Sequence, residues 1–186
     1  MAVAQRMTEQ DYERFVMTGV EGAWELHDGV LVEKPGMSWD HCRFITRLAR
    51  QLLRQLDEAV HDVRFNEGRV RKPDDTVYIP DLLVVPVAYG WDFAGRPVLA
   101  IFSGPLPLVV EVWSPSTGAY DVDTKVPVYQ QRGDREIWRL HSFEKTLRIW
   151  VRQPNGSYRE SLHRAGIVSL SALAGVSIDL DRLFAD

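Results

Sequence analysis

Two strongly apolar segments, each carrying one acidic residue, constrain the fold of this chain more than any other feature. Pro80-Asp81 leads into the aliphatic run Leu82–Val85, and Glu111 interrupts a second run, Leu108–Trp113. Runs of this kind are typical of strands that are buried on both faces of a sheet. An ionised carboxylate in such surroundings is destabilising by roughly several kcal/mol unless a cation or hydrogen bonds stabilise it. Asp81 and Glu111 are therefore the first candidates for a functional site.

The composition fits a single domain over residues 1–186 that does not enter a membrane. Of the 186 residues, 45% are hydrophobic and 26% are charged, as in ordinary globular proteins. The longest apolar stretches, near 98–102 and 106–110, are far too short to cross a bilayer, and the N-terminus lacks the pattern of a secretory signal. A lone cysteine, Cys42, excludes an internal disulfide and a multi-cysteine zinc cluster. We expect a cytoplasmic protein.

The charge of the chain bears on whether its partner is a nucleic acid. With 22 Lys and Arg against 26 Asp and Glu, the formal charge is −4, whereas proteins that bind nucleic acids usually present a basic surface. Basic residues are nevertheless concentrated in one region of the sequence: Arg43, Arg47, Arg50, Arg54, Arg64, Arg69, Arg71 and Lys72. They form either a local patch for phosphates or a solvated helix face.

Capping signals and hydrophobic periodicity predict alternating helices and strands along the chain. Helices are expected at Thr8–Met17, at Ser38–Asp57, and from Asp121 or Asp123 to Arg132 ahead of the helix stop Gly133. Strands are expected in the hairpin Trp24–Glu33 and at Val63–Arg71, Thr76–Pro86, Leu108–Trp113, Glu136–His141 and Thr146–Val151. The segment 88–107 is expected to be an irregular loop, and the tail from Ser157 to contain one further strand and a weak terminal helix.

The two acids together with Lys125 point to metal-dependent phosphate chemistry. Mg²⁺ commonly takes one or two carboxylates from a protein, and Asp81 and Glu111 meet that demand, with the Val112 carbonyl as a further candidate ligand. Lys125 is then available to orient an attacking water or to stabilise charge on the phosphoryl oxygens. Structural alternatives remain open: Asp81 capping a loop amide, Glu111 paired with a buried arginine, and Lys125 solvated on its helix.

Three further residues are weaker candidates for the same site. Tyr129 lies one helical turn after Lys125 on the same face, where it either bonds within the site or packs in the core. His41 falls on the apolar stripe of the long helix and is either a satisfied core histidine or directed into a cleft. Glu25 belongs to the polar side of the first hairpin strand and is either solvated or part of the site.

These motifs, in this order and spacing, resemble those of the Uma-type restriction endonuclease family, a bacterial domain within the PD-(D/E)XK nuclease superfamily. The resemblance covers almost the whole chain and rests on the segments Thr8–Tyr12, Trp24–Val32, His41, Pro80-Asp81, Glu111–Thr117, Asp121, Lys125, Tyr129, Gly133 and Glu136–Trp138. It implies an α/β (α+β) fold with a restriction-endonuclease-like core, in which a mixed central β-sheet is flanked by helices, with an N-terminal helix and β-hairpin.

The resemblance also implies a metal held by Asp81 and Glu111. The lysine that in the superfamily usually follows the second acid by two residues is replaced by Trp113, and in this family it lies in the following helix, where Lys125 fills its place. The chain departs from the family pattern at two positions: Pro127, early in that helix, is expected to distort it, and His141 stands where such proteins often carry an acidic residue, outside the expected metal centre.

The resulting hypothesis is a Mg²⁺- or Mn²⁺-dependent endonuclease that hydrolyses phosphodiester bonds in DNA. Motifs of other enzymes are missing from the sequence: it has no Gly-x-Ser-x-Gly elbow, no phosphate-binding loop, no dinucleotide fingerprint and no His-Glu-x-x-His pair. Two rivals stay open, a non-catalytic module on a nuclease fold that binds nucleic acid or protein, and an assembly protein whose charges form internal ion pairs. A homodimer is the expected assembly, because a duplex has two strands to cut.

Overall fold

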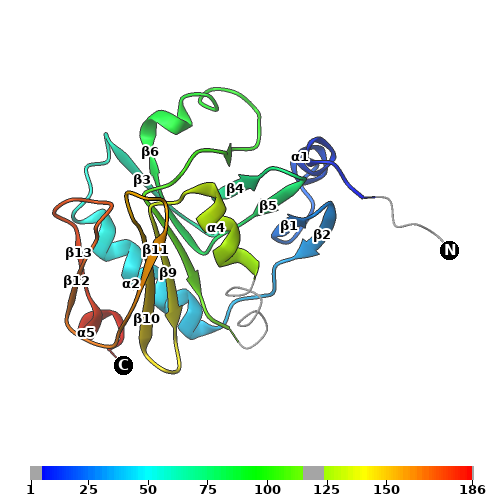
Figure 1. The fold of residues 1–186 in the computed structure, drawn as a ribbon. Coiled ribbons are helices and arrows are strands. Elements are labelled where there is room, and N and C mark those ends of the chain that lie inside the picture. The colour runs from blue at the N-terminus through cyan, green and yellow to red at the C-terminus, as the bar shows by residue number, and fades with distance from the viewer. Residues whose placement is uncertain (1–5, 115–123, 186) are drawn as a thin grey trace.

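The computed structural model describes residues 6–114 and 124–185, which form an α+β fold around two mixed β-sheets (Figure 1). The larger sheet has six strands, in spatial order β11 (Tyr158–His163), β10 (Thr146–Arg152), β9 (Glu136–His141), β8 (Leu108–Val112), β6 (Leu82–Pro86) and β3 (His61–Phe65). The smaller has five, in spatial order β2 (Val30–Glu33), β1 (Trp24–His27), β5 (Thr76–Tyr78), β4 (Arg69–Lys72) and β7 (Ile101–Phe102). The predicted mixed sheet is thus confirmed, although a second sheet accompanies it.

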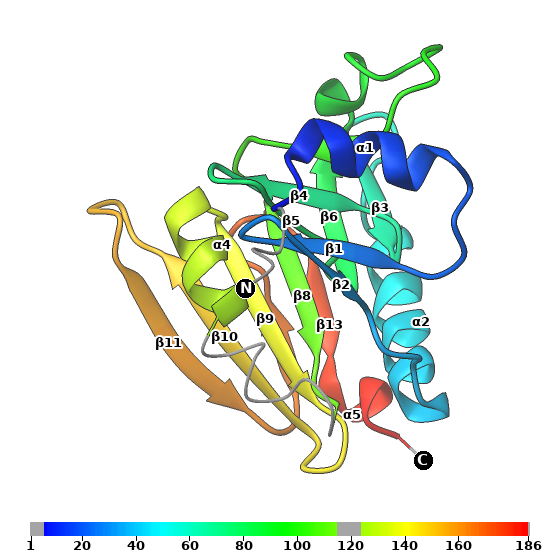
Figure 2. The same cartoon turned by 90° about the vertical axis from the view of Figure 1, so that its right-hand side faces the viewer.

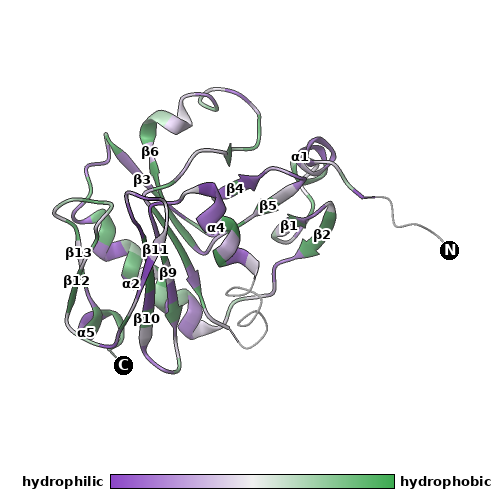
Figure 3. Ribbon diagram, in the orientation of Figure 1, coloured by the Kyte–Doolittle hydropathy of each residue, from purple (hydrophilic) through white to green (hydrophobic). Residues whose placement is uncertain are grey.

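One face of the larger sheet is covered by the long helix α2 (Trp39–Leu53). Its N-cap is Ser38, whose side chain accepts a hydrogen bond from the His41 amide, as the sequence predicted. The apolar stripe of α2 packs on the sheet beside the small hairpin β12 (Ile167–Ser169) and β13 (Ser177–Asp179) and the short helix α5 (Leu180–Leu183). Figure 3 shows that hydrophobic and hydrophilic residues alternate along this helix, and the buried residues form one stripe of it.

The opposite face of the larger sheet packs against helix α4 (Val126–Arg132) and part of the smaller sheet (Figure 2). Leu82 and Val84 of β6 belong to the core on the α2 side, whereas Leu83 and Val85 belong to the core on the α4 side. The prediction that this strand is buried on both faces is therefore confirmed.

The smaller sheet carries the N-terminal helix α1 (Glu9–Met17), whose N-cap is Thr8 as predicted. Tyr12 of α1 is fully buried against Leu26, Val77 and Ile101 of the sheet. The hairpin β1–β2 turns at Asp28-Gly29, where both residues have positive φ, and this prediction is confirmed. This arrangement places the hairpin next to the chain segment that links the two sheets.

Two predicted continuous strands are wrong, because the chain crosses between the sheets within each. Segment 63–71 is divided into β3 of the larger sheet and β4 of the smaller, with Asn66 at φ 59° between them. Segment 76–86 is divided in the same way into β5 and β6. The second break contains Pro80, which cannot donate to a sheet ladder, and it leaves Asp81 at the junction of the two sheets.

Smaller differences concern element ends. Helix α2 ends at Leu53 rather than near Asp57, and the tail contains three strands where one was expected. Pro127 lies in the first turn of α4, where no backbone donor is needed, and residues 124–125 just before this helix are π-helical, so the start of the helix is irregular as predicted. The predicted caps Asp121 and Asp123 lie outside the described residues.

Two further predictions about the fold agree with the structure. Gly133 has φ 79° and ends α4. The irregular segment after β6 contains only the 3-10 turn η1 (Val87–Gly90) and the short strand β7. No helix in the described ranges has the length and hydropathy to cross a membrane.

Candidate active site

Asp81 and Glu111 lie side by side at the end of two central strands. Strands β6 and β8 are antiparallel, with Leu82 opposite Val110, so Asp81 comes opposite Glu111 in the same register. Both residues are almost fully buried, with 1% and 2% of their surface exposed. The Val112 amide donates a hydrogen bond of 2.7 Å to Asp81 Oδ2, which fixes the orientation of that carboxylate.

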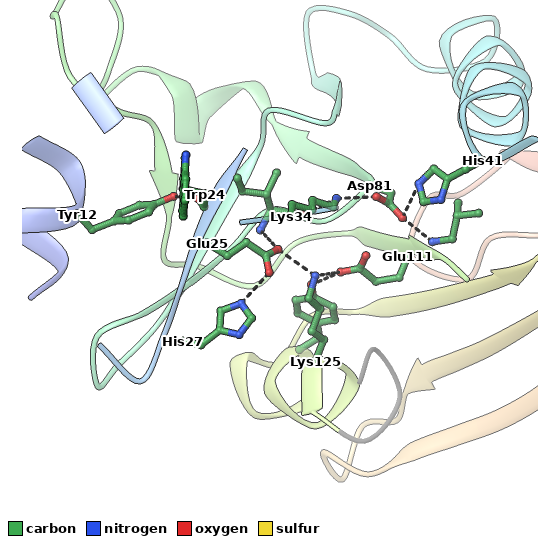
Figure 4. Close-up of polar contacts among 12 residues, drawn as sticks. Tyr12, Trp24, Glu25, His27, Lys34, His41, Asp81, Glu111 and Lys125 are labelled. Carbon is green, nitrogen blue, oxygen red and sulfur yellow. Dashed lines mark hydrogen bonds and ion pairs between the residues drawn. The ribbon is translucent and has the colours of Figure 1, made fainter. Parts of the chain in front are cut away.

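Lys125 links two of the buried acids. It precedes α4, and its ammonium lies 2.9 Å from Glu25 Oε1 and 3.4 Å from Glu111 Oε1 (Figure 4). Lys125 is itself only 3% exposed, so the interpretation of this residue as a solvated helix lysine is wrong. Tyr129, one turn further along α4, donates a hydrogen bond of 2.6 Å to the same Glu111 oxygen. The predicted helical face therefore brings both side chains onto Glu111.

Glu25 is the acid for which the sequence gave the least support. It is 3% exposed, which contradicts a solvated position. Its carboxylate accepts hydrogen bonds of 2.8 Å from the Ile79 amide and from His27 Nε2. Burial by itself raises the pKa of Glu25, but the positive charge of Lys125 and then these hydrogen bonds outweigh it and lower that pKa to about 2. Glu25 is thus ionised and holds Lys125 in place.

Lys34 is a site residue that the sequence did not reveal. It follows β2, and its ammonium lies 2.6 Å from Asp81 Oδ1 and 2.8 Å from the Ile79 carbonyl oxygen. Burial lowers the pKa of Lys34, but the negative charges of Asp81 and Glu111 outweigh it and raise that pKa. For Asp81 the same pair acts in the other direction: burial raises the pKa of its carboxyl, and Lys34 followed by His41 lowers it well below the usual range. Both groups are charged.

His41 reaches the site from the first turn of α2. Its Nε2 lies 3.2 Å from Asp81 Oδ2, which is an ion-pair distance, but the geometry is not that of a hydrogen bond. Within residues 6–114 and 124–185, neither buried ring nitrogen of His41 has a hydrogen-bond partner. An unsatisfied buried polar group is rare in native structures, so His41 is not a satisfied core histidine.

These groups share one cavity of about 450 Å³ between the hairpin, the start of α2 and the ends of β6 and β8. Its lining includes six buried or partly buried charged or titratable residues that are candidates for chemistry: Glu25, Lys34, His41, Asp81, Glu111 and Lys125. Figure 4 shows them converging from separate elements of both sheets and from α2. The residues that the sequence selected are therefore brought together, with Val112 also in the lining. Tyr129 is linked to the site by its hydrogen bond to Glu111.

The donor set is suited to a magnesium-type ion. Among the described residues, no group of three or more His, Cys, Asp or Glu side chains is arranged to hold a metal, which disfavours a zinc-like cage. Mg²⁺ and Mn²⁺ need fewer protein ligands and keep several waters, and the adjacent carboxylates Asp81 and Glu111 meet that lower demand. Within the described residues the ring nitrogens of His41 beside them have no hydrogen-bond partner, which is further evidence that a ligand or water belongs in the cavity.

Comparison with known proteins identifies the family of this chain and a similar structure. The chain matches a family model described as "Uma2: Putative restriction endonuclease" over residues 9–181. The chain belongs to the Uma2 family. The crystal structure of a "putative nuclease belonging to DUF820" from Anabaena variabilis superposes with a TM-score of 0.76 at 14% identity, covering 96% of this chain and 97% of that one. No match is found among the curated proteins.

The Uma2 assignment confirms the resemblance drawn from the sequence, and the structural similarity confirms a nuclease fold. Part of the motif that suggested it, residues 115–117 and Asp121, lies outside the described residues. Lys34 escaped notice because it contacts a carboxylate that only the tertiary fold brings near. His27 lies two residues after Glu25 on the same face of β1, so strand alternation could have linked the two residues.

The basic residues between positions 43 and 72 are spread over α2, β3 and β4 of both sheets. Several of them have intramolecular partners. Arg71 pairs with Glu9, Arg64 lies 2.8 Å from Asp62, and Arg69 donates to the Tyr12 hydroxyl. These residues therefore do not constitute a single helix face.

Proposed function

We propose that this Uma2 protein is a Mg²⁺- or Mn²⁺-dependent endodeoxyribonuclease. The observation that carries the proposal is the pair Asp81 and Glu111, buried side by side at the wall of a cavity that also contains two lysines. Carboxylates suit a hard divalent cation, and ammonium groups suit a phosphate. Their combination in one concave site is the chemistry of phosphodiester hydrolysis.

In this proposal Asp81 and Glu111 hold the metal, with the Val112 carbonyl as a further ligand. When bound, the metal ion stabilises negative charge on the scissile phosphate and lowers the pKa of a coordinated water. The Val112 amide keeps the Asp81 carboxylate in its present orientation through a bond of 2.7 Å. The Tyr129 hydroxyl does the same for Glu111 through a bond of 2.6 Å. Both contacts are of the kind that preorganises ligands before the metal arrives.

Lys125 and His41 supply the remaining chemistry. Glu25 holds Lys125 at the cavity wall, where the ammonium is available to neutralise charge on the phosphoryl oxygens. His41 has buried ring nitrogens along the same wall without hydrogen-bond partners in the described parts of the chain. We assign it the task of positioning the attacking water or accepting its proton.

The proposal is tested by cleavage of supercoiled plasmid DNA with Mg²⁺ or Mn²⁺. Asp81→Asn and Glu111→Gln remove one charge each at nearly constant shape and are expected to reduce cleavage about 100-fold or more. Asp62→Asn is the matched control, because Asp62 is a half-exposed acid of β3 paired only with Arg64 at the surface. This control is expected to cleave like the wild type. Unchanged cleavage in either site variant contradicts the catalytic assignment.

A non-catalytic binding module is the second candidate. Two observations favour it: the formal charge of −4, and the ammonium of Lys34 already 2.6 Å from Asp81. It predicts that the wild type retains DNA or a protein partner but shows no metal-dependent cleavage. Calorimetry with Mg²⁺ separates the candidates, because a binding module has no need of an ion at Asp81 and Glu111.

A further inference from the structure

Lys34 occupies one side of the carboxylate that the proposed function assigns to the metal. Its ammonium lies 2.6 Å from Asp81 Oδ1, while Oδ2 of the same carboxylate accepts from the Val112 amide and lies 3.2 Å from His41. The oxygen that is not bound to the backbone is therefore the one that Lys34 covers. A metal ion bound to that oxygen would be repelled by the ammonium of Lys34, because charges are poorly screened in a buried site.

The net charge of the cavity also disfavours a metal ion together with both ammonium groups at the carboxylates. Three buried carboxylates, Glu25, Asp81 and Glu111, face two lysines, Lys34 and Lys125, so these five groups together carry a charge of −1. A divalent cation among them, with both ammonium groups still in place, would change that charge to +1 in a buried site, which is costly. One ammonium is therefore expected to move away from the carboxylates.

The contacts identify which lysine leaves. Lys125 lies between two carboxylates, at 2.9 and 3.4 Å, and its ammonium is 5.5 Å from the centroid of the Tyr78 ring. Lys34 has one carboxylate and one carbonyl oxygen, and its side chain is 13% exposed against 4% for Lys125. Lys34 also begins the segment 34–38 between β2 and α2, which has neither helix nor strand. Lys34 therefore has weaker contacts than Lys125 and is the lysine expected to move.

We propose that Lys34 and a divalent cation compete for Asp81. Lys34 neutralises Asp81 in the metal-free protein and moves away from Oδ1 into the cavity when the ion binds. This inference rests on the proposed metal site. It assigns Lys34 as a positioning residue that sets metal affinity through Asp81, and it makes the metal-free and metal-bound arrangements of this carboxylate mutually exclusive.

The first test is calorimetric titration of Mg²⁺ into the wild type and Lys34→Met, without DNA. Methionine keeps most of the aliphatic stem, and Asp81 keeps its bond from the Val112 amide. We expect the dissociation constant for Mg²⁺ to fall about tenfold or more in Lys34→Met, a coupling of ordinary size between two exclusive states. Lys72→Gln removes the same charge from β4, outside the cavity, and is expected to change the constant less than about twofold. Adding Asp81→Asn to Lys34→Met is expected to abolish the gain.

The outcomes separate this inference from the proposed function. Equal Mg²⁺ affinity in the wild type and Lys34→Met, or weaker binding in the variant, overturns the competition while leaving the metal site intact. If neither protein binds Mg²⁺ or Mn²⁺, both the competition and the metal site are wrong. Tighter binding in Lys34→Met that survives Asp81→Asn also overturns it, because the ion then lies elsewhere.

A second test uses the unmodified chain and does not depend on how the variant folds. Lysine acylation followed by mass spectrometry is carried out with and without Mg²⁺. We expect acylation of Lys34 to rise several-fold with Mg²⁺, because its ammonium leaves the carboxylate, while acylation of Lys72 stays constant. No rise at Lys34 at a Mg²⁺ concentration that saturates the calorimetric signal overturns the proposal.

Discussion

Replacing Lys125 by methionine tests the charge arrangement of the site through stability alone. The ammonium of Lys125 lies 2.9 Å from Glu25 and 3.4 Å from Glu111, and all three residues are at most 3% exposed. Lys125→Met leaves two buried carboxylates facing each other without the cation between them. Removing one partner of a buried pair typically lowers the free energy of unfolding by about 3–5 kcal/mol.

That loss is large against the total stability of a domain of this size. With a total of about 5–15 kcal/mol, Lys125→Met removes roughly a fifth or more of it, and the melting temperature falls by about 10 °C. Urea denaturation at pH 7 measures the loss directly. The matched control is Lys72→Met in β4, outside the cavity, which is expected to change the free energy of unfolding by less than about 0.5 kcal/mol.

A double substitution separates loss of the ion pair from loss of packing. Lys125→Met/Glu25→Gln removes the cation together with one of the carboxylates that it stabilises. We expect this variant to recover about 1–3 kcal/mol relative to Lys125→Met, because the two residues are in direct contact. A loss below about 1 kcal/mol for Lys125→Met, or no recovery in the double variant, would refute the reasoning.

Further predictions concern pH, an internal hydrogen bond and a helix cap. The pKa of Glu25 is lowered from 4.5 to about 2, so ionised Glu25 contributes about 3 kcal/mol to the free energy of unfolding above pH 4.5, and this contribution is lost as the pH falls towards 2. Urea denaturation should show the stabilities of the wild type and Glu25→Gln converging over that range. A constant difference between the two proteins would contradict this prediction. Tyr129→Phe removes the 2.6 Å hydrogen bond to Glu111. Urea denaturation should show a free energy of unfolding lower by about 1.5–3 kcal/mol, and calorimetry should show Mg²⁺ affinity about tenfold weaker. Unchanged values would show that Tyr129 does not belong to the site. Ser38→Ala removes the cap of α2 and should lower thermal stability by about 1 kcal/mol, whereas Ser38→Asp should keep it.

The sequence located the site through the cost of burying charge. Asp81 and Glu111 stand out because acids are rare within aliphatic runs, and this signal is local to each strand. The pairing of β6 with β8 in one sheet then places the two acids opposite each other. Lys125 was selected because it follows the two acids closely and matches the lysine of the family motif, and Tyr129 followed from helical spacing.

The breaks between the two sheets could not be predicted from residue patterns. The residues on both sides of Asn66 and of Pro80 have the hydrophobic pattern of one continuous strand. The chain changes direction at these two positions because it passes from one sheet to the other. Glu25 was misjudged for the same reason. It alternates with apolar residues as a solvated side chain would, but the Ile79 amide and Lys125, distant in sequence, cover it.

Lys34 shows the limit of local reasoning most clearly. A lysine beside Pro35 after a hairpin is ordinary turn chemistry, and nothing in its neighbours indicates burial. Its contact with Asp81 spans 47 positions in the chain. A residue whose role depends on one long-range contact leaves no periodic trace in the sequence.

A crystal grown or soaked with Mn²⁺ tests the central claim most directly, because anomalous scattering locates the ion without any assumption about activity. We predict an anomalous peak at about 2.2 Å from carboxylate oxygens of both Asp81 and Glu111. A peak that contacts only surface acids, or no peak in the cavity while the protein fold is unchanged, would contradict a metal-dependent nuclease site at these residues.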